Sequence, residues 1–189
     1  MSINKTALVA VVALLASGCV FQKQAIRLEP TVIVTSSSVG SGKLTMVSVS
    51  DERPHSGLGT RGVGGIGEQL TLNSDLVATV KAAVTDGLQR QGFATTGPIE
   101  NQLRVEIRNL DYSVNSGFWA GKLNVEFLLK GICVKGNARP YEQMYRGEFH
   151  KNVQVAQGEN SNTEFVNQVV SQAINALLND ANMTQCLAQ

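Results

Sequence analysis

The chain has 189 residues, and its 16 lysines and arginines nearly balance its 15 aspartates and glutamates. The charged fraction of 16% lies below the usual share of about 25%. This balance offers no basic surplus for binding nucleic acid, and the length suits one domain with a proper hydrophobic core.

The start of the chain has the pattern of a secretory signal that ends at a cysteine. Ten apolar residues, 7–16, follow a short segment with one basic side chain. A signal core needs about 7–15 apolar residues and a membrane-spanning helix about 20, so this run fits a signal. The small residues Ser17 and Gly18 then precede Cys19. This end resembles the bacterial lipobox, with Ala16 at the position where leucine is commonest.

The lipobox resemblance implies three modifications of the chain. The sulfur of Cys19 carries diacylglycerol, the chain is cleaved before this residue, and the new amine is acylated, for example with palmitate. Several acyl chains together give a lasting membrane anchor. Because Val20 and not aspartate follows, the usual sorting rule implies the outer membrane, with the protein facing the periplasm. A plain signal peptide with a chance cysteine, or an apolar helix of the fold, are the alternatives.

Three parts of the chain are therefore expected. Residues 1–18 form a cleaved lipoprotein signal, and residues 19–30 form the lipidated cysteine with a short polar tether. Residues 31–189 form a single α+β periplasmic domain. In an oxidising compartment the two remaining cysteines, Cys133 and Cys186, are candidates for a disulfide. A thiol nucleophile is the alternative, but it would want a nearby histidine that no motif supplies.

The residue pattern in the first half of the domain predicts three strands, at residues 31–35, 44–50 and 66–72. Residues 51–67 are rich in glycine and predict a loop or a loosely paired ribbon. Within them, residues 57–62 match G-x-G-x-x-G literally. The dinucleotide fingerprint requires a helix to open at that turn, whereas more glycines follow here. We therefore expect no nucleotide binding.

Two amphipathic helices are predicted. Asn73 or Ser74 caps the first, which ends at Gly92, and the phenylalanine after that glycine can pack back on the helix. Apolar residues recur on one face of this helix at helical spacing, namely Leu76, Val77, Val80, Ala83, Val84 and Leu88. The second helix opens with an S-x-x-E capping box at 161–164. Residues 179–189 form a polar tail that brings Cys186 within reach of the domain.

Three long strands lie between the helices, at residues 103–114, 123–134 and 141–155. In the first, the apolar positions change from odd to even numbers, which predicts a β-bulge near Arg108 and Asn109. Short connections predict antiparallel neighbours. The order β-β-β-α-β-β-β-α thus predicts an α+β fold with one antiparallel sheet and two helices packed on one face. The other face is then exposed or covered by a partner.

Several runs of the chain together match a known pattern. These are LEP at 28–30, MVSVSDERP at 46–54, LTL at 70–72, L-x-x-x-G-F at 88–93, LRVEI at 103–107 and FVNQVVSQAINALL at 165–178. With the lipobox before them, they resemble the YajG-type bacterial lipoproteins. The resemblance implies an outer-membrane lipoprotein of poorly defined role, with no catalytic residues to carry over. The glycine-rich insert and the cysteine pair depart from this pattern.

Few residues suggest chemistry. His55 and His150 lie far apart in sequence and neither has metal-ligand spacing, so we expect no metal, no cofactor and no catalytic residue. Asp51 and Arg53 leave the second strand together and form either a salt-bridged turn or a recognition spot. Trp119 lies between glycines and is either a binding anchor or a cap over the sheet edge.

Two classes of function fit these features. The first is a non-enzymatic module, held on the membrane by lipid on Cys19, that docks onto an unknown envelope protein or peptidoglycan through its free sheet face or edge. The second is a carrier of small ligands or a hydrolase of cell-wall fragments with a cleft between sheet and helices. The missing acid–base and metal patterns favour the first.

Overall fold

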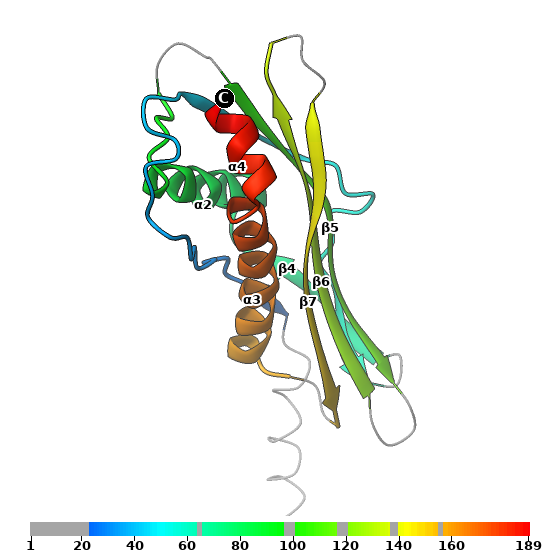
Figure 1. The fold of residues 1–189 in the computed structure, drawn as a ribbon. Coiled ribbons are helices and arrows are strands. Elements are labelled where there is room, and N and C mark those ends of the chain that lie inside the picture. The colour runs from blue at the N-terminus through cyan, green and yellow to red at the C-terminus, as the bar shows by residue number, and fades with distance from the viewer. Residues whose placement is uncertain (1–22, 64–65, 97–100, 117–120, 137–139, 155–156) are drawn as a thin grey trace, which may run out of the picture.

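The computed structural model describes residues 23–63, 66–96, 101–116, 121–136, 140–154 and 157–189. The predicted signal, Cys19 and Trp119 lie outside these ranges. In the described chain, seven strands form one sheet and three helices lie on one side of it (Figure 1). The elements in chain order are β1 Gln24–Ile26, β2 Thr45–Asp51, β3 Gly59–Val63, β4 Ile66–Leu72, α2 Leu76–Arg90, β5 Asn101–Ser116, β6 Gly121–Val134, β7 Tyr141–Val153, α3 Glu159–Leu178 and α4 Ala181–Ala188.

The sheet is mixed, so the predicted purely antiparallel sheet is wrong. Its strand order is β1-β4-β3-β5-β6-β7, and β2 also pairs with β5. The β3–β4 hairpin and the β5-β6-β7 meander are antiparallel, as short connections require. However, β2 runs parallel to β5, and β1 runs parallel to β4. The long path from β2 to β5, through the hairpin and α2, makes the parallel pairing possible.

Strand β5 is the centre of this arrangement. Its first half pairs with β2 from Thr45 to Asp51, and further along Tyr112 pairs with Gly59 of β3. The register against β6 shifts between Ile107 and Asn109, which confirms the predicted bulge. The extra residue bends the strand between its two partners, because a bulge increases the local twist.

The amino-terminal part of the domain differs from the prediction. Residues 24–26, expected in the tether, form β1 at the sheet edge. Residues 31–35, expected to be a strand, pair with no strand. Residues 27–33, which we call the strap, run along α3 instead, and polar side chains of that helix bind the backbone of the strap. The odd-numbered peptide groups of the strap are hydrogen-bonded to helix side chains without joining a sheet, so its β-branched residues gave a false strand signal.

The helix ends show which capping signals were correct. Gly92, with φ of 89°, follows the C-cap of α2, and the next amide, that of Phe93, donates to the Leu88 carbonyl at 3.0 Å. This is a Schellman ending, as the glycine predicted. The N-cap of α2 is Asp75, not Asn73 or Ser74.

The last helical region begins earlier and extends further than predicted. Helix α3 starts at Glu159 after Gly158, without a side-chain cap, so the predicted capping box at 161–164 lies inside the helix. The expected polar tail contains α4, whose N-cap Asp180 accepts amide hydrogen bonds from Asn182 and Met183. The described chain therefore has three helices rather than two. None of these helices is both long enough and apolar enough to cross a membrane.

One hydrophobic core fills the space between the helices and the sheet. Helix α3 packs on β6 and β7, while α2 packs on β2. At Gly147 of β7 the two layers touch, because a Cβ there would lie 1.9 Å from the carbonyl oxygen of Val169. The absence of a side chain at this position lets α3 lie directly on the strand. Because the described helices lie on one side of the sheet, the opposite face of β5, β6 and β7 carries no helix (Figure 1).

Candidate interaction surface

The face of β5, β6 and β7 that turns away from the helices carries mostly polar and charged side chains. Along β6, buried residues alternate with more exposed ones, because successive side chains point to opposite sides of a sheet. We call the exposed set the outer face. Its main residues are Asn109, Asn124, Glu126, Lys130, Glu142, Met144, Arg146, Glu148 and His150.

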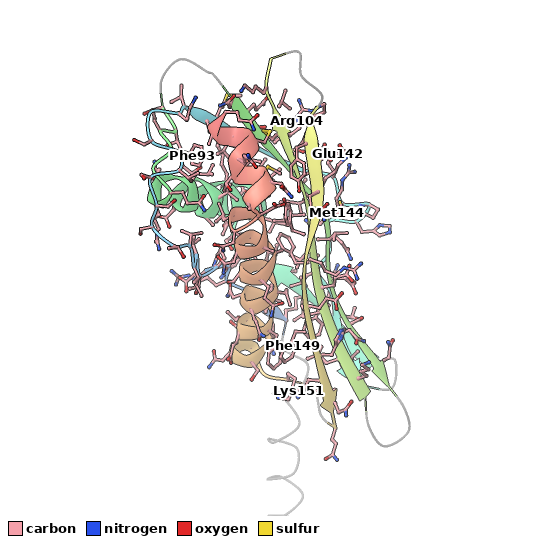
Figure 2. The ribbon with its side chains drawn as sticks, viewed as in Figure 1. Phe93, Arg104, Glu142, Met144, Phe149 and Lys151 are labelled. Atoms are coloured by element: carbon pink, nitrogen blue, oxygen red, sulfur yellow. A yellow bond between two sulfur atoms is a disulfide. The ribbon has the colours of Figure 1, made fainter. Side chains whose placement is uncertain are left out.

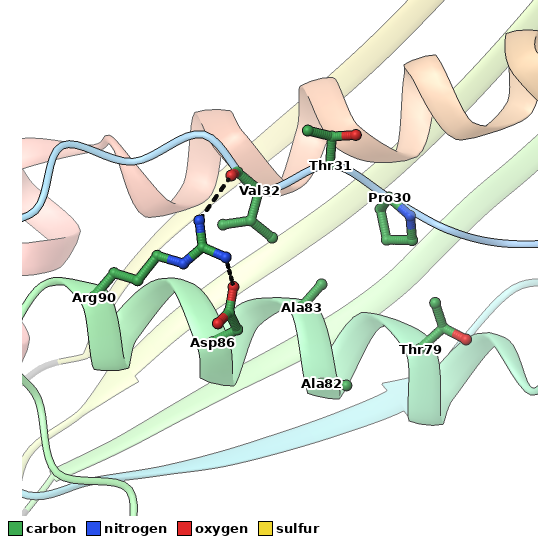
Figure 3. A pocket seen from close by; sticks show the side chains of 8 residues that line it. All are labelled: Pro30, Thr31, Val32, Thr79, Ala82, Ala83, Asp86 and Arg90. Carbon is green, nitrogen blue, oxygen red and sulfur yellow. Dashed lines mark hydrogen bonds and ion pairs between the residues drawn. The ribbon is translucent and has the colours of Figure 1, made fainter.

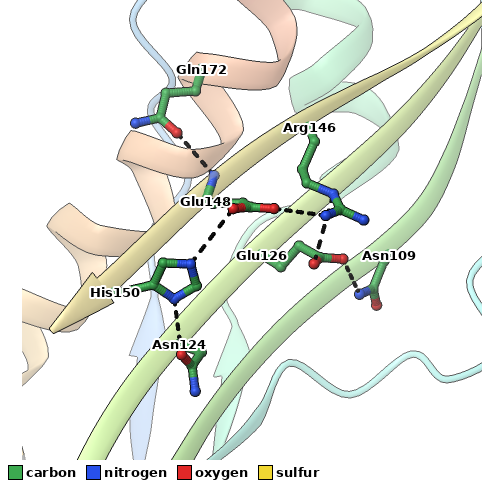
Figure 4. Close-up of polar contacts among 7 residues, drawn as sticks. All are labelled: Asn109, Asn124, Glu126, Arg146, Glu148, His150 and Gln172. Carbon is green, nitrogen blue, oxygen red and sulfur yellow. Dashed lines mark hydrogen bonds and ion pairs between the residues drawn. The ribbon is translucent and has the colours of Figure 1, made fainter. Parts of the chain in front are cut away.

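Arg146 holds two carboxylates together at the middle of the outer face (Figure 4). Glu126 and Glu148 stand directly opposite each other on β6 and β7, and like charges in that position repel. Arg146 donates to Glu148 at 2.8 Å, and its Nε lies 3.9 Å from Glu126. The hydrogen bond from Arg146 lowers the pKa of Glu148. The same bond raises the pKa of Arg146, so both groups stay charged at neutral pH.

Neutral polar groups continue this network on both sides. Asn109, at the bulge, donates to Glu126 at 3.0 Å. The Nδ1 atom of His150 lies 2.9 Å from the side-chain oxygen of Asn124, and its Nε2 lies 3.6 Å from Glu148. The network therefore spans β5, β6 and β7 and orients a row of polar side chains.

Further along β7, the outer face carries an exposed apolar side chain. Met144 is 42% exposed and stands opposite Lys130 of β6. Lys130 in turn forms an ion pair of 2.8 Å with Glu142, two residues from Met144. Figure 2 labels Glu142 and Met144 along this part of β7. Met144 is thus an exposed apolar side chain with paired charges beside it.

Asp51 and Arg53, predicted as a salt-bridged turn or a recognition spot, bind each other. The Arg53 guanidinium donates from Nε and Nη2 to the two Asp51 carboxylate oxygens, at 2.8 Å each. The hydrogen bond from Arg53 lowers the pKa of Asp51. The Arg53 side chain is only 5% exposed, and its Nη1 is buried without a hydrogen bond. This is the geometry of the salt-bridged turn, in which the two charged groups form an ion pair with each other.

The two cysteines of the domain form a disulfide in the structure. Cys133 of β6 and Cys186 of α4 are bonded, with their Cα atoms 6.4 Å apart. Nearby, Tyr141 and Tyr145 of β7 donate to the same Asp180 oxygen, at 3.0 and 2.6 Å. Burial raises the pKa of Tyr145, so its hydroxyl remains a donor at neutral pH. The bond and the two tyrosines attach α4 to the sheet.

A cleft of about 630 Å³ lies between the strap and α2 (Figure 3). Its walls are small or apolar, with Pro30 and Val32 on one side and Ala82 on the other. The charged lining residues, Asp86 and Arg90, bind each other at 2.7 Å, and Arg90 also donates to the Val32 carbonyl at 3.4 Å. The cleft is therefore not between the sheet and the helices, where the ligand site of a carrier or hydrolase was expected.

Comparison with known proteins identifies the family of the chain. Residues 30–188 match a family described as uncharacterized lipoproteins. The chain belongs to this family. The match covers nearly the whole domain and supports the YajG-type resemblance of the sequence. No curated protein sequence matches the lipoprotein.

Solved structures share the fold at low sequence identity. A Xanthomonas campestris protein of the DUF330 family is 14% identical, with a TM-score of 0.55 over 86% of the lipoprotein and 95% of that chain. A putative neuraminyllactose-binding hemagglutinin homolog from Helicobacter pylori is 6% identical, with a TM-score of 0.51 over 85% and 98% of the two chains. At these identities the similarity concerns the fold alone.

The residues that hold the strap were not predicted from the sequence. Three side chains of α3 and that of its C-cap residue, spaced four residues apart, bind the strap backbone, and we call them the polar ladder. They are Asn167, Ser171, Asn175 and Asn179. Asn167 accepts from the Glu29 amide at 2.6 Å and donates to the Arg27 carbonyl at 2.8 Å, so its amide imitates a neighbouring strand. The N-x-x-x-S-x-x-x-N-x-x-x-N spacing on one helix face is the signal that could have found them.

The remaining predicted residues have separate places. Trp119 is outside the described ranges, so its role as anchor or cap stays a prediction. His55 is exposed in the loop after β2, far along the chain from the His150 network. Among the described residues, no group of three His, Cys, Asp or Glu side chains could hold a metal ion.

Proposed function

We propose that this lipoprotein is an interaction module of the cell envelope, without enzymatic activity. In this proposal lipid on Cys19 holds it at the periplasmic side of the outer membrane, and its outer face binds a partner protein. Membership in a lipoprotein family supports the anchor. The outer face supports the binding role, because it is an extended surface that the helices of the chain leave uncovered.

The observation that carries the proposal is the exposed Met144 within the ion pairs of the outer face. An apolar contact at the centre of an interface contributes affinity, while surrounding charges select the partner and its orientation. The charges of Glu126, Arg146 and Glu148 are already fixed by each other. Their ordered positions reduce the entropy lost when a partner of complementary charge binds.

Photo-crosslinking in intact envelopes tests the proposed surface. A photoreactive amino acid at Met144 is expected to capture a discrete protein, identified by mass spectrometry. The same group at Lys81, exposed on α2, is the matched control and should not capture it. Arg146→Glu should abolish the crosslink from position 144, whereas Lys81→Glu should leave it unchanged. Equal products from both positions, or capture of peptidoglycan alone, would contradict binding of a partner protein at this face.

The anchor and the absence of turnover are tested separately. Labelling with radioactive palmitate should be lost in Cys19→Ala, and the labelled protein should sediment with outer membranes in a density gradient. Label that persists in this variant would contradict lipidation at Cys19. Hydrolysis of cell-wall fragments or of an ester panel by the purified lipoprotein would contradict the non-enzymatic role.

A further inference from the structure

The first residues of the domain are locked to its interior by a buried polar network. Asn162 of α3 is fully buried and donates to the side-chain oxygen of Gln24, at 2.7 Å. Tyr112 of β5, also buried, donates its hydroxyl to Asn162 at 2.7 Å. Buried polar groups are costly unless they are hydrogen-bonded, so separating β1 from this network is unfavourable. Gln24 is therefore a fixed point from which the reach of the preceding residues can be measured.

The strand pairings give the position of Gln24 along the strand direction of the sheet. Gln24 pairs with Leu70 of β4, Leu70 pairs with Gly59 of β3, and Gly59 pairs with Tyr112. Gln24 is thus level with Tyr112, four residues before β5 ends at Ser116. At about 3.3 Å per residue, the end of β5 lies about 13 Å beyond Gln24.

The direction of β1 shows toward which end of the sheet the preceding residues start. Strand β1 is parallel to β4, which is antiparallel to β3, which is parallel to β5. The chain before Gln24 therefore starts toward the end of the sheet at which β5 finishes. Cys19 precedes Gln24 by five residues, which span at most about 18 Å. The end of β5 already lies about 13 Å beyond Gln24, so a chain of at most about 18 Å lets the cysteine extend only about 5 Å past that end.

We propose that this end of the sheet rests on the membrane surface and that Lys122 and Lys151 bind the phosphate groups of anionic phospholipids. We call it the membrane end, and it is where β5 ends at Ser116, β6 begins at Gly121 and β7 ends at Val153. The inference rests on the lipid that the proposed function assigns to Cys19. A lipid on so short a chain holds the membrane end against the bilayer and leaves the other end of the sheet far from it.

The charges near this end fit a phosphate surface. Lys122 is the second residue of β6, and Lys151 is two residues before the end of β7; both are exposed. The Nζ of Lys151 lies 5.2 Å from the centre of the Phe165 ring, and Figure 2 labels this lysine near the end of β7. Lys23, also exposed, adds a third charge just before β1. Glu159, the first residue of α3, is an acidic residue in the first turn of that helix.

Site-specific fluorescence in vesicles tests the orientation. In the lipidated, full mature chain, Cys19 carries lipid and the other two cysteines are bonded, so an introduced cysteine is the free thiol. Asn152→Cys and Glu142→Cys lie on β7, the first near the membrane end and the second near the other end. Each is labelled with a fluorophore that aqueous dithionite destroys, in vesicles of phosphatidylethanolamine and phosphatidylglycerol. The label at position 152 should react several-fold more slowly than the label at position 142.

The lysines are tested in the same assay. A lysine near an anionic surface shifts the equilibrium toward contact by about five-fold. Lys122→Ala with Lys151→Ala should therefore remove most of the protection at position 152, as should neutral phosphatidylcholine vesicles. Lys81→Ala with Lys135→Ala is the matched control, because these lysines lie on α2 and beyond the other end of β6, and it should change nothing.

Each contrary result overturns a stated part of the inference. Equal dithionite rates at positions 152 and 142, in protein that floats with the vesicles, would refute the orientation. Protection at 152 that is unchanged in the double lysine variant and in neutral vesicles would refute phosphate binding. Protein that does not float with the vesicles would lack its lipid, and this result would overturn both the anchor and the orientation.

Discussion

Reduction of the Cys133–Cys186 disulfide is expected to lower the free energy of unfolding by about 4 kcal/mol. The two cysteines are 53 residues apart in sequence. In the chain-entropy model, closing a loop of about this length contributes about 4 kcal/mol, mainly by restricting the unfolded chain. Met183 and Leu187 of α4 are buried in the core independently of the bond. We therefore expect reduction to shift the whole unfolding transition and not to release α4 alone.

Urea unfolding of the lipoprotein with and without dithiothreitol measures this effect. With a denaturant slope of about 2 kcal/mol per molar, the midpoint should fall by about 2 M on reduction. Reduced protein and the Cys133→Ala, Cys186→Ala double variant should unfold at similar midpoints, which separates the bond from the side chains. Hydrogen exchange should show α4 amides protected in both forms. A midpoint shift well under 0.5 M, or loss of α4 protection before the main transition, would refute the reasoning.

Three further predictions concern single residues. Gly147→Ala should destabilise the protein by about 3 kcal/mol or more in thermal unfolding, because the new Cβ would overlap the Val169 carbonyl, whereas Gly158→Ala, at the N-cap of α3 with open space around it, should cost about 1 kcal/mol or less. Asn162→Leu should cost about 1–3 kcal/mol for each buried partner that it leaves unsatisfied. The folded pKa of Asp51 is lowered, so its contribution to stability is present above the unfolded pKa of about 3.9 and is lost as the pH falls through the folded pKa. Asp51→Asn should therefore make the acid-induced loss of stability shallower, and an unchanged pH dependence would contradict the paired geometry.

Local patterns predicted the features that depend on neighbouring residues. The change of parity in β5 located the bulge between Ile107 and Asn109, because alternation of apolar residues records which way each side chain points. Gly92 located the end of α2, because the left-handed backbone there favours glycine. The antiparallel meander of β5, β6 and β7 followed from its short connections.

Features that join distant parts of the chain were not predictable in this way. The parallel pairing of β2 with β5 joins Thr45 to Asn101, and no local pattern marks strands that are not consecutive. Strand β1 has three residues, too few for a periodic signal. The residues at 31–35 are β-branched and extended, but their hydrogen-bond partners are helix side chains such as Ser171 and Asn175.

The sequence predicted that the sheet has a free face, but it did not predict which residues of β6 and β7 form that face. A sheet with helices on one face implies a free face, which the order of elements predicted. Met144 and its neighbours could not be identified in advance, because the pairing of β6 with β7 decides which charges meet. Glu126 and Arg146 are twenty positions apart in sequence and become partners only through that register.

The buried Gln24 network and the polar ladder both act on the residues that were expected to be a loose tether. They make that stretch part of the folded domain, so the fold sets the distance between Gln24 and the outer face. Under the proposed orientation, Met144 stands nine residues of β7 from Val153, or about 30 Å from the membrane surface. A partner must then reach the outer face through the periplasm, well clear of the lipid. Photoreactive groups at Met144 should therefore capture protein, while the same groups at Asn152 should capture phospholipid.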